Sequence, residues 1–193
     1  LDQSRDKGVR GDGFDQLEKQ LAEIGKDVQV SGDGAKSEEP RTEQLQNLIN
    51  LYTQGQYQTA QTQASQLLKQ FPNSVNLYNI IGVTDKELGN LDEAIDAYNK
   101  ALSIRPNVAE VYNNIGNALK DQSKLEDAID AYKKALSINP DYAEAYNNMG
   151  NTLNKQCKLD EAIEAYNKAL SINPNNAEAY NNMGIALTEQ RRL

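Results

Sequence analysis

The chain has 193 residues, a formal net charge of −8 at pH 7, no histidine and one cysteine. The acidic balance argues against nucleic acid and anionic membrane surfaces as partners, because both bind clustered Lys and Arg, and it favours a neutral or basic protein. The lack of His excludes zinc sites built from Cys and His and catalytic mechanisms that need imidazole, and a single cysteine excludes an intrachain disulfide. We therefore expect a chain that is not an enzyme and that holds no metal and no cofactor.

Targeting signals are also missing from the sequence. No apolar run approaches the roughly 18 residues of a membrane-spanning helix, and no basic and apolar leader opens the chain. The expected location is cytoplasmic. Because Leu1 and not Met opens the sequence, we interpret the start as a processed or excised end, and a removed export signal stays open as an alternative.

Residues 1–40 are expected to form a flexible N-terminal segment, since residues 1–13 are rich in Gly and charge and residues 31–40 have a linker composition. Residues 13–25 differ, because their apolar side chains recur at helical spacing and predict an amphipathic helix. The apolar residues are Phe14, Leu17, Leu21 and Ile24. This helix either covers an exposed apolar end of the ordered chain or binds a partner or the chain's own groove.

The rest of the chain repeats with a period of 34 residues. We count places within each unit from residues 75, 109, 143 and 177, which gives full units at 75–108, 109–142 and 143–176, a half unit at 177–193 and a divergent unit at 41–74. The period is set by one proline, one glycine and one alanine per unit: Pro72, Pro106, Pro140, Pro174, Gly82, Gly116, Gly150, Gly184, Ala60, Ala94, Ala128 and Ala162. Seven of the ten tyrosines occupy the fourth or twenty-fourth place, so we assign them to structure first.

Each unit is predicted to form two helices. In the second full unit the apolar spacing predicts a first helix over residues 109–122, a turn at 123–124 and a second helix over residues 125–138, which Pro140 ends. Gly116 and Ala128 are expected at the closest approach of the two helices.

Polar residues mark the expected start of the next helix. Two residues also depart from the repeat pattern. Asp141 and Glu144 have the spacing of a capping box. Asp85 replaces the leucine of the other units, and a buried carboxylate is costly unless paired, so we expect the first full unit to be more open. Cys157 occupies the tight turn where earlier units have Gly55 and Gly89, and we interpret it as a tolerated small residue.

A 34-residue period with Tyr, Gly, Ala, Tyr, Ala and Pro at fixed places resembles the tetratricopeptide repeat. The resemblance covers residues 75–193 closely and 41–74 less closely. It implies an all-α fold, a right-handed α-solenoid of antiparallel helix hairpins, in which the first helix of each unit lines the concave side. The string NN[I/M]GN is similar to the repeats that precede the catalytic domain of O-linked N-acetylglucosamine transferases.

The resemblance also implies that the second, fifth, sixth, ninth and thirteenth places face the groove. Asparagine recurs at these places, although it is a poor helix former. Its amide offers a donor and an acceptor, which suits binding of an extended peptide backbone. We therefore predict eight peptide-binding residues: Asn113, Asn114, Asn117, Asn147, Asn148, Asn151, Asn181 and Asn182. The alternative is that these side chains hydrogen-bond between neighbouring units or face water.

These features favour a non-catalytic protein–protein interaction scaffold that binds an extended segment of a partner in an Asn-lined concave groove. A related subclass binds C-terminal carboxylates through Lys and Arg, but the comparable places here hold Asn and Glu. A second hypothesis is the targeting arm of a larger transferase, because the sequence stops after a turn with the second helix of its unit missing. A third is self-association through open solenoid ends.

Overall fold

The computed structural model describes residues 39–192, so the helix predicted at 13–25 lies outside the described residues. The described part consists of helices joined by short turns, without β-strands. The helices are α2 (Thr42–Thr53), α3 (Tyr57–Leu68), α4 (Val75–Glu87), α5 (Leu91–Ile104), α6 (Ala109–Asp121), α7 (Leu125–Ile138), α8 (Ala143–Lys155), α9 (Leu159–Ile172) and α10 (Ala177–Gln190).

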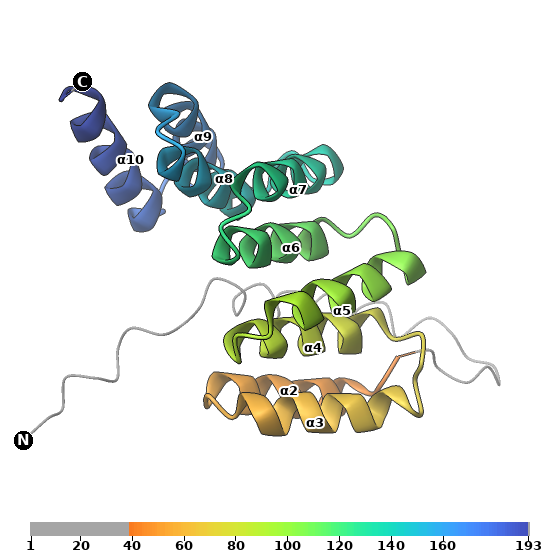
Figure 1. The fold of residues 1–193 in the computed structure, drawn as a ribbon. Helices are drawn as coiled ribbons and strands as arrows, with labels where there is room; N and C mark the ends of the chain where they lie inside the picture. Colours follow the sequence, from red (N-terminus) through yellow and green to blue (C-terminus); the bar gives the residue numbers. More distant parts are fainter. Residues whose placement is uncertain (1–38, 193) are drawn as a thin grey trace, which may run out of the picture.

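Consecutive helices pair into hairpins, and the hairpins stack in chain order from α2–α3 at one end to α10 at the other (Figure 1). We call α2, α4, α6, α8 and α10 the first helices, and α3, α5, α7 and α9 the second helices. Each second helix packs against the first helix of its own unit and against that of the next unit. The fold is therefore the predicted all-α solenoid of helical hairpins.

The tight turn inside each hairpin uses left-handed backbone. Gly55 and Gly89 have φ angles of 72° and 83°, and the equivalent Ser123 and Cys157 have φ angles of 62° and 59°. This conformation costs little for glycine and more for residues with a Cβ atom. Cys157 therefore occupies a turn position that suits glycine better, and its side chain is exposed.

The expected capping box at Asp141 and Glu144 is wrong. α8 has Tyr142 at its N-cap with no side-chain hydrogen bond, because the helix begins one residue later than a cap at Asp141 requires. The backbone N–H of Asp141 instead donates to the side-chain oxygen of Asn139 at 3.1 Å. At α10 the side chain of Asn176 is the cap and accepts from the N–H of Ala179.

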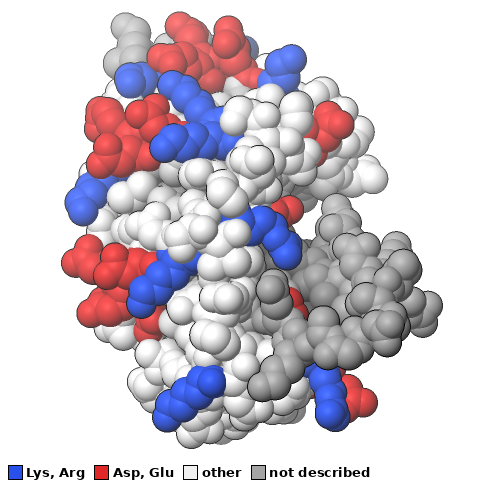
Figure 2. Space-filling view, turned by 90° about the vertical axis from the view of Figure 1, so that its right-hand side faces the viewer, with Lys and Arg blue, Asp and Glu red and all other residues white. Residues whose placement is uncertain are grey.

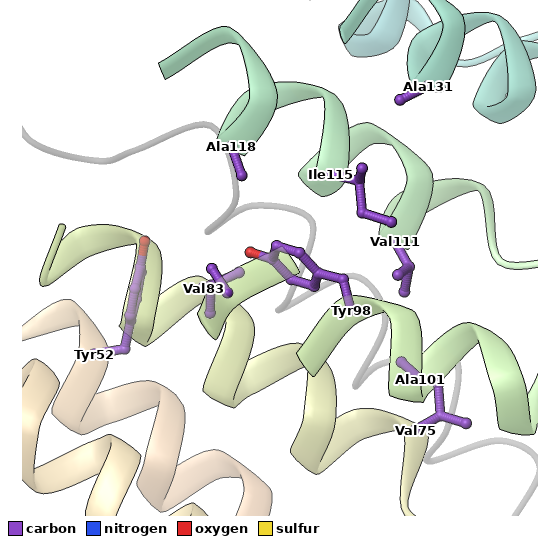
Figure 3. Close-up of a cluster of buried hydrophobic side chains, with 10 residues drawn as sticks. Tyr52, Val75, Val83, Tyr98, Ala101, Val111, Ile115, Ala118 and Ala131 are labelled. Carbon is purple, nitrogen blue, oxygen red and sulfur yellow. The ribbon is translucent and has the colours of Figure 1, made fainter. Parts of the chain in front are cut away.

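The three hairpins from α4 to α9 are each closed by a tyrosine ring that lies on a glycine. A Cβ atom added to Gly82, Gly116 or Gly150 would lie 2.3, 2.4 or 2.6 Å from the nearest ring carbon of the tyrosine at the twenty-fourth place. These rings, Tyr98, Tyr132 and Tyr166, are among the largest fully buried side chains. Figure 3 shows the first of them at the centre of its apolar cluster. Gly116 therefore meets a ring of the second helix, and Ala128 is also fully buried.

The segment before α2 is tied to the array. The carboxylate of Glu39 accepts a hydrogen bond from the N–H of Val75 at 2.9 Å and another from the hydroxyl of Ser74. The Ser74 side chain in turn caps α4 by accepting from the N–H of Leu77. Glu39 therefore docks on the start of the first full unit.

The expectation that Asp85 opens the first full unit is wrong. Asp85 is only 4% exposed, and its carboxylate accepts a hydrogen bond from the side chain of Gln61 in α3 at 3.1 Å. Burial raises the pKa of the Asp85 carboxyl above its ordinary value of 3.8, against hydrogen bonds from Gln61 and Asn90 that lower it. The neighbouring unit supplies the partner that the sequence pattern alone did not reveal.

Asp85→Leu, which restores the leucine of the other units, is expected to raise the free energy of unfolding at pH 7 by about 1–2 kcal/mol, because it removes a desolvated carboxylate. The folded pKa is raised, so the contribution of Asp85 to stability is fully present below its unfolded pKa and is lost as pH rises through the folded value. The advantage of the variant should therefore shrink on acidification. Urea unfolding at several pH values measures this, with the exposed Asp96→Leu as control. An advantage that does not change with pH would contradict the assignment.

Candidate peptide-binding surface

The first helices form an inner layer of the solenoid. Each of them contacts the first helix of the next unit, so α2, α4, α6, α8 and α10 follow one another without an intervening second helix. An ion pair joins two of them at 3.9 Å, from Lys86 in α4 to Asp121 in α6. We call the side chains at the second, fifth, sixth, ninth and thirteenth places of these helices the inner face.

The asparagines of the fifth and sixth places pair between units. The side-chain nitrogen of Asn114 donates to the side-chain oxygen of Asn79, 35 residues earlier, at 3.0 Å. The same bond joins Asn148 to Asn113 at 3.2 Å and Asn182 to Asn147 at 3.4 Å. Every junction between successive first helices from α4 to α10 therefore has one amide–amide hydrogen bond.

A glutamate of the following unit completes two of these three pairs. The side-chain nitrogen of Asn113 donates to the carboxylate of Glu144 at 3.0 Å, and that of Asn147 donates to Glu178 at the same distance. A fifth-place asparagine thus uses both its oxygen and its nitrogen on the following unit. The glutamates were expected to cap helices, and the structure gives them this inter-unit role instead.

Burial separates the eight predicted asparagines into two groups. Asn113, Asn114, Asn147 and Asn148 are between 0% and 6% exposed, and their amides bond to neighbouring units. Asn117, Asn151 and Asn182 are half-buried and Asn181 is exposed. The first group corresponds to the inter-unit alternative that the sequence left open, and so does the bond of Asn182 to Asn147. The second group reaches the surface of the inner face.

The two ninth-place asparagines are held by tyrosines of their own units. The hydroxyl of Tyr132 donates to the side-chain oxygen of Asn117 at 2.8 Å, and the hydroxyl of Tyr166 donates to that of Asn151 at 2.7 Å. Burial, then the nearby carboxylates Glu178 and Glu189, raise the pKa of Tyr166 to about 12, so its hydroxyl remains a donor at neutral pH. The amide nitrogens of both asparagines have no hydrogen-bond partner among the described residues, and the tyrosines fix their orientation.

The first full unit lacks this arrangement because its ninth place is Val83. The hydroxyl of Tyr98 is buried without a hydrogen-bond partner among the described residues, and burial raises its pKa well above the ordinary value. In Figure 3 this hydroxyl points toward Val83. Sequence reasoning missed the link between the ninth and twenty-fourth places, although Tyr and Asn recur there 15 residues apart.

Tyr98→Phe is expected to leave stability unchanged or raise it slightly, because it removes a buried hydroxyl that has no partner. Tyr132→Phe is expected to lower the free energy of unfolding by about 1 kcal/mol, since it removes a hydrogen bond and leaves the Asn117 oxygen unpaired. The two substitutions delete the same atom at equivalent places, so each is the control of the other in urea unfolding. Equal losses in both variants would show that the tyrosine–asparagine bond does not stabilise the unit.

The charges of the inner face are mostly acidic. Its second and thirteenth places hold Asn76, Glu87, Glu110, Asp121, Glu144, Lys155, Glu178 and Glu189. Figure 2 shows another side of the molecule, where acidic side chains gather in separate groups along one edge and basic side chains lie between them. The visible part of that side has no continuous basic field of the kind that phosphate backbones require.

Other kinds of site are not evident in the described residues. Within residues 39–192, His, Cys, Asp and Glu side chains do not gather in threes or more as metal ligands would. None of the helices in this range combines the length and the apolar character that a bilayer crossing requires.

Comparisons with known proteins agree with this geometry. Family descriptions of the TPR repeat match residues 82–123 and 116–156, and those of the tetratricopeptide repeat match residues 45–74, 143–176 and 165–193. No curated protein sequence matches the chain significantly.

Several solved structures are similar to this one. A crystal structure of MamA is 31% identical, over 74% of this chain and 84% of that chain, with a TM-score of 0.66. The first TPR of Spaghetti (RPAP3), bound to the HSP90 peptide SRMEEVD, is 27% identical over 61% of this chain and 93% of that chain, with a TM-score of 0.59. PilF of Pseudomonas aeruginosa shares the fold, with 23% identity, coverage of 78% and 68% and a TM-score of 0.71.

Proteins built from these repeats mediate protein–protein interactions, and the Spaghetti structure shows one that holds a peptide. The 34-residue period, the glycine–tyrosine contacts and these similarities lead to one assignment. The chain belongs to the tetratricopeptide-repeat family.

Proposed function

We propose that this chain is a non-catalytic scaffold that binds an extended segment of a partner protein along its inner face. The observation that supports the proposal is the hydrogen bonding of the Asn117 and Asn151 side chains. Their amide oxygens are used by tyrosine hydroxyls, and their nitrogens are oriented donors without a partner among the described residues. An extended peptide presents carbonyl oxygens along its length, which such donors can bind regardless of sequence.

The surface-reaching amides continue toward the C-terminal end of the inner face. Asn181 is exposed and Asn182 is half-buried, although the Asn182 nitrogen also donates to Asn147 and Glu178 at 3.4 and 3.3 Å. The four buried asparagines have a different part in the proposal. They set the spacing of the first helices and thereby the spacing of the donors.

Charge selects the class of peptide. The inner face has six carboxylates and one lysine at its second and thirteenth places, so a neutral or basic segment fits it better than an acidic one. The HSP90 peptide SRMEEVD that Spaghetti binds carries acidic residues at its C-terminal end. It is therefore a reference ligand that this chain should bind weakly or not at all.

The test uses the full chain on an array of 15-residue synthetic peptides of neutral, basic and acidic composition, with SRMEEVD included. The test variant is Asn117→Asp with Asn151→Asp, which keeps the oxygen that accepts from tyrosine and removes the free donor. We expect neutral peptides to bind the unmodified chain and to bind this variant at least tenfold more weakly, a loss of about 1.4 kcal/mol, with an unchanged melting temperature.

Asn99→Asp with Asn167→Asp is the matched control, because it adds the same charge on exposed positions of the second helices. This control should retain binding. Equal weakening in the control and test variants would assign the effect to net charge, and a failure of every peptide to bind would overturn the proposal.

A further inference from the structure

The available amide donors of the inner face form one short row. Asn117 in α6 and Asn151 in α8 occupy the same place of adjacent units, and their amide nitrogens have no partner among the described residues. The ninth places of α4 and α10 hold Val83 and Ile185 instead. We call the two asparagine nitrogens the donor row. A ligand on this row meets one donor from each of two neighbouring helices.

The donor row presents N–H groups and turns its oxygens away. Each oxygen accepts from a tyrosine hydroxyl of its own unit, at 2.8 Å in α6 and 2.7 Å in α8. The oxygen and nitrogen lie on opposite sides of a planar amide, so each nitrogen points away from that tyrosine. The four buried asparagines offer a ligand little, because they bond between units. The row is therefore suited to carbonyl oxygens and not to backbone N–H groups.

The acceptors that the inner face offers are carboxylates. Lys86 pairs with Glu87 at 2.8 Å and with Asp121 at 3.9 Å, which neutralises part of the charge near α4. Glu110 in α6 and Glu189 in α10 form no ion pair or hydrogen bond within residues 39–192. Charge-assisted hydrogen bonds are the stronger ones, so these carboxylates favour ammonium or guanidinium groups over a neutral N–H. The inner face is thus complementary to carbonyls and cationic side chains.

Proline meets the first of these two requirements. It has a backbone carbonyl and no backbone N–H, so it leaves no peptide donor facing the donor row. Proline-rich segments adopt the polyproline II conformation, which has no internal hydrogen bonds and leaves its carbonyls open. This conformation exists before binding, so less conformational entropy is lost when the segment binds.

The spacing of the donor row fits the same conformation. Packed helices lie about 8–10 Å apart, and α6 and α8 are in contact and joined by the bond from Asn148 to Asn113. A polyproline II segment rises about 3.1 Å per residue with three residues per turn, so equivalent carbonyls recur about every 9 Å. In a β-strand they recur every two residues, about 6–7 Å, which is too short to reach both helices in the same way.

We infer that the inner face binds a proline-rich, basic segment of a partner protein in the polyproline II conformation. Carbonyls three residues apart accept from Asn117 and Asn151, and lysine or arginine side chains pair with the carboxylates of Glu110 and Glu189. This inference rests on the proposed function and narrows its ligand from any extended backbone to one class of segment.

The probe is a fluorescently labelled peptide of Pro-Pro-Lys repeats, measured by fluorescence anisotropy with the full chain. A peptide of Gly-Ser-Lys repeats is the control, because it has the same length and charge but is flexible and has backbone N–H groups. We expect saturable binding of the Pro-Pro-Lys probe, at least tenfold tighter than that of the control. A peptide of Pro-Pro-Glu repeats should bind at least tenfold more weakly than the probe, because its carboxylates meet those of the inner face.

Two pairs of substitutions test the donor row in the protein. Asn117→Ala with Asn151→Ala removes both donors without a change in net charge, and it should weaken binding of the Pro-Pro-Lys probe at least tenfold. Asn99→Ala with Asn167→Ala is the matched control on exposed positions of the second helices and should retain binding.

Val83→Asn tests the row by extending it. The hydroxyl of Tyr98 is buried without a partner within the described residues and points toward Val83 in Figure 3, so it can hold a new amide there as Tyr132 holds Asn117. This variant should bind the Pro-Pro-Lys probe several-fold more tightly and the Gly-Ser-Lys control no more tightly. The absence of any gain in a variant that still unfolds cooperatively would overturn the register of the donor row.

The outcomes separate this inference from the function on which it rests. If the Pro-Pro-Lys and Gly-Ser-Lys peptides bind equally well and both weaken in the double alanine variant, the extended-peptide function stands and the polyproline class is overturned. If the probe does not bind, or binds the double alanine variant as tightly as the unmodified chain, the inference is also overturned. If peptides of every composition fail to bind, the proposed function fails with it.

Discussion

Gly116→Ala is expected to lower the free energy of unfolding by about 1–3 kcal/mol, the usual cost of overpacking a filled core. The new methyl group would lie 2.4 Å from a ring carbon of Tyr132, a distance at which one of the two groups must move. Tyr132 is fully buried and its hydroxyl is bonded to Asn117, so the ring has no free space to enter. The loss should appear in urea unfolding followed by circular dichroism.

Gly184→Ala is the matched control for this substitution. It occupies the same place of the unit and has nothing within 4 Å of the added carbon. Because alanine is the better helix former by about 1 kcal/mol, this variant should be as stable as the unmodified chain or more stable. Similar losses at both positions would mean that glycine is required for backbone reasons and not for the tyrosine contact.

Asn113→Ala should have a comparable or larger effect, about 2–4 kcal/mol, because two hydrogen bonds to the next unit disappear within the buried inner layer. Asn113 is fully buried, accepts from Asn148 at 3.2 Å and donates to Glu144 at 3.0 Å. The substitution therefore removes an acceptor from one buried amide and a donor from one carboxylate. Thermal and urea unfolding both report the loss.

Asn181→Ala changes the same fifth place in α10, where the side chain lacks the inter-unit hydrogen bonds of Asn113. Asn181 is exposed and forms no inter-unit bond among the described residues, so its replacement by the better helix former should change the free energy of unfolding by less than about 0.5 kcal/mol. A substantial loss at Asn181, or none at Asn113, would contradict the view that the fifth-place asparagines stabilise the junctions between units.

Local features of the fold were predictable from the sequence. Short-range periodicity placed the second helix of the second full unit at residues 125–138, the range that α7 occupies. The 34-residue period placed Gly116 and the twenty-fourth-place tyrosines in the hairpin core. These predictions depend on residues close in sequence, whose spacing determines which helix face they share.

The errors concern contacts between units. Asp85 was expected to open its unit, but its partner Gln61 lies in the preceding hairpin. Glu144 has the spacing of a capping box, yet its carboxylate accepts a hydrogen bond from Asn113, 31 residues earlier. Spacing along one helix does not show which side chain of the next unit lies opposite. For the asparagines, composition indicated an unusual stripe, and only three-dimensional packing separated the amides that bond between units from those that reach the surface.

The amide–amide bonds also make each unit depend on its neighbours along the chain. Each fifth-place asparagine depends on the unit that follows it, and each sixth-place asparagine depends on the unit before it. Stability in a linear repeat array is close to a sum of unit and nearest-neighbour terms, so losing one terminal unit removes the polar partner of the next. Unravelling that starts at α10 would thus expose the Asn147 amide first and then the Asn113 amide. In that order, each unit would lose its polar partner only after the unit that follows it has unfolded.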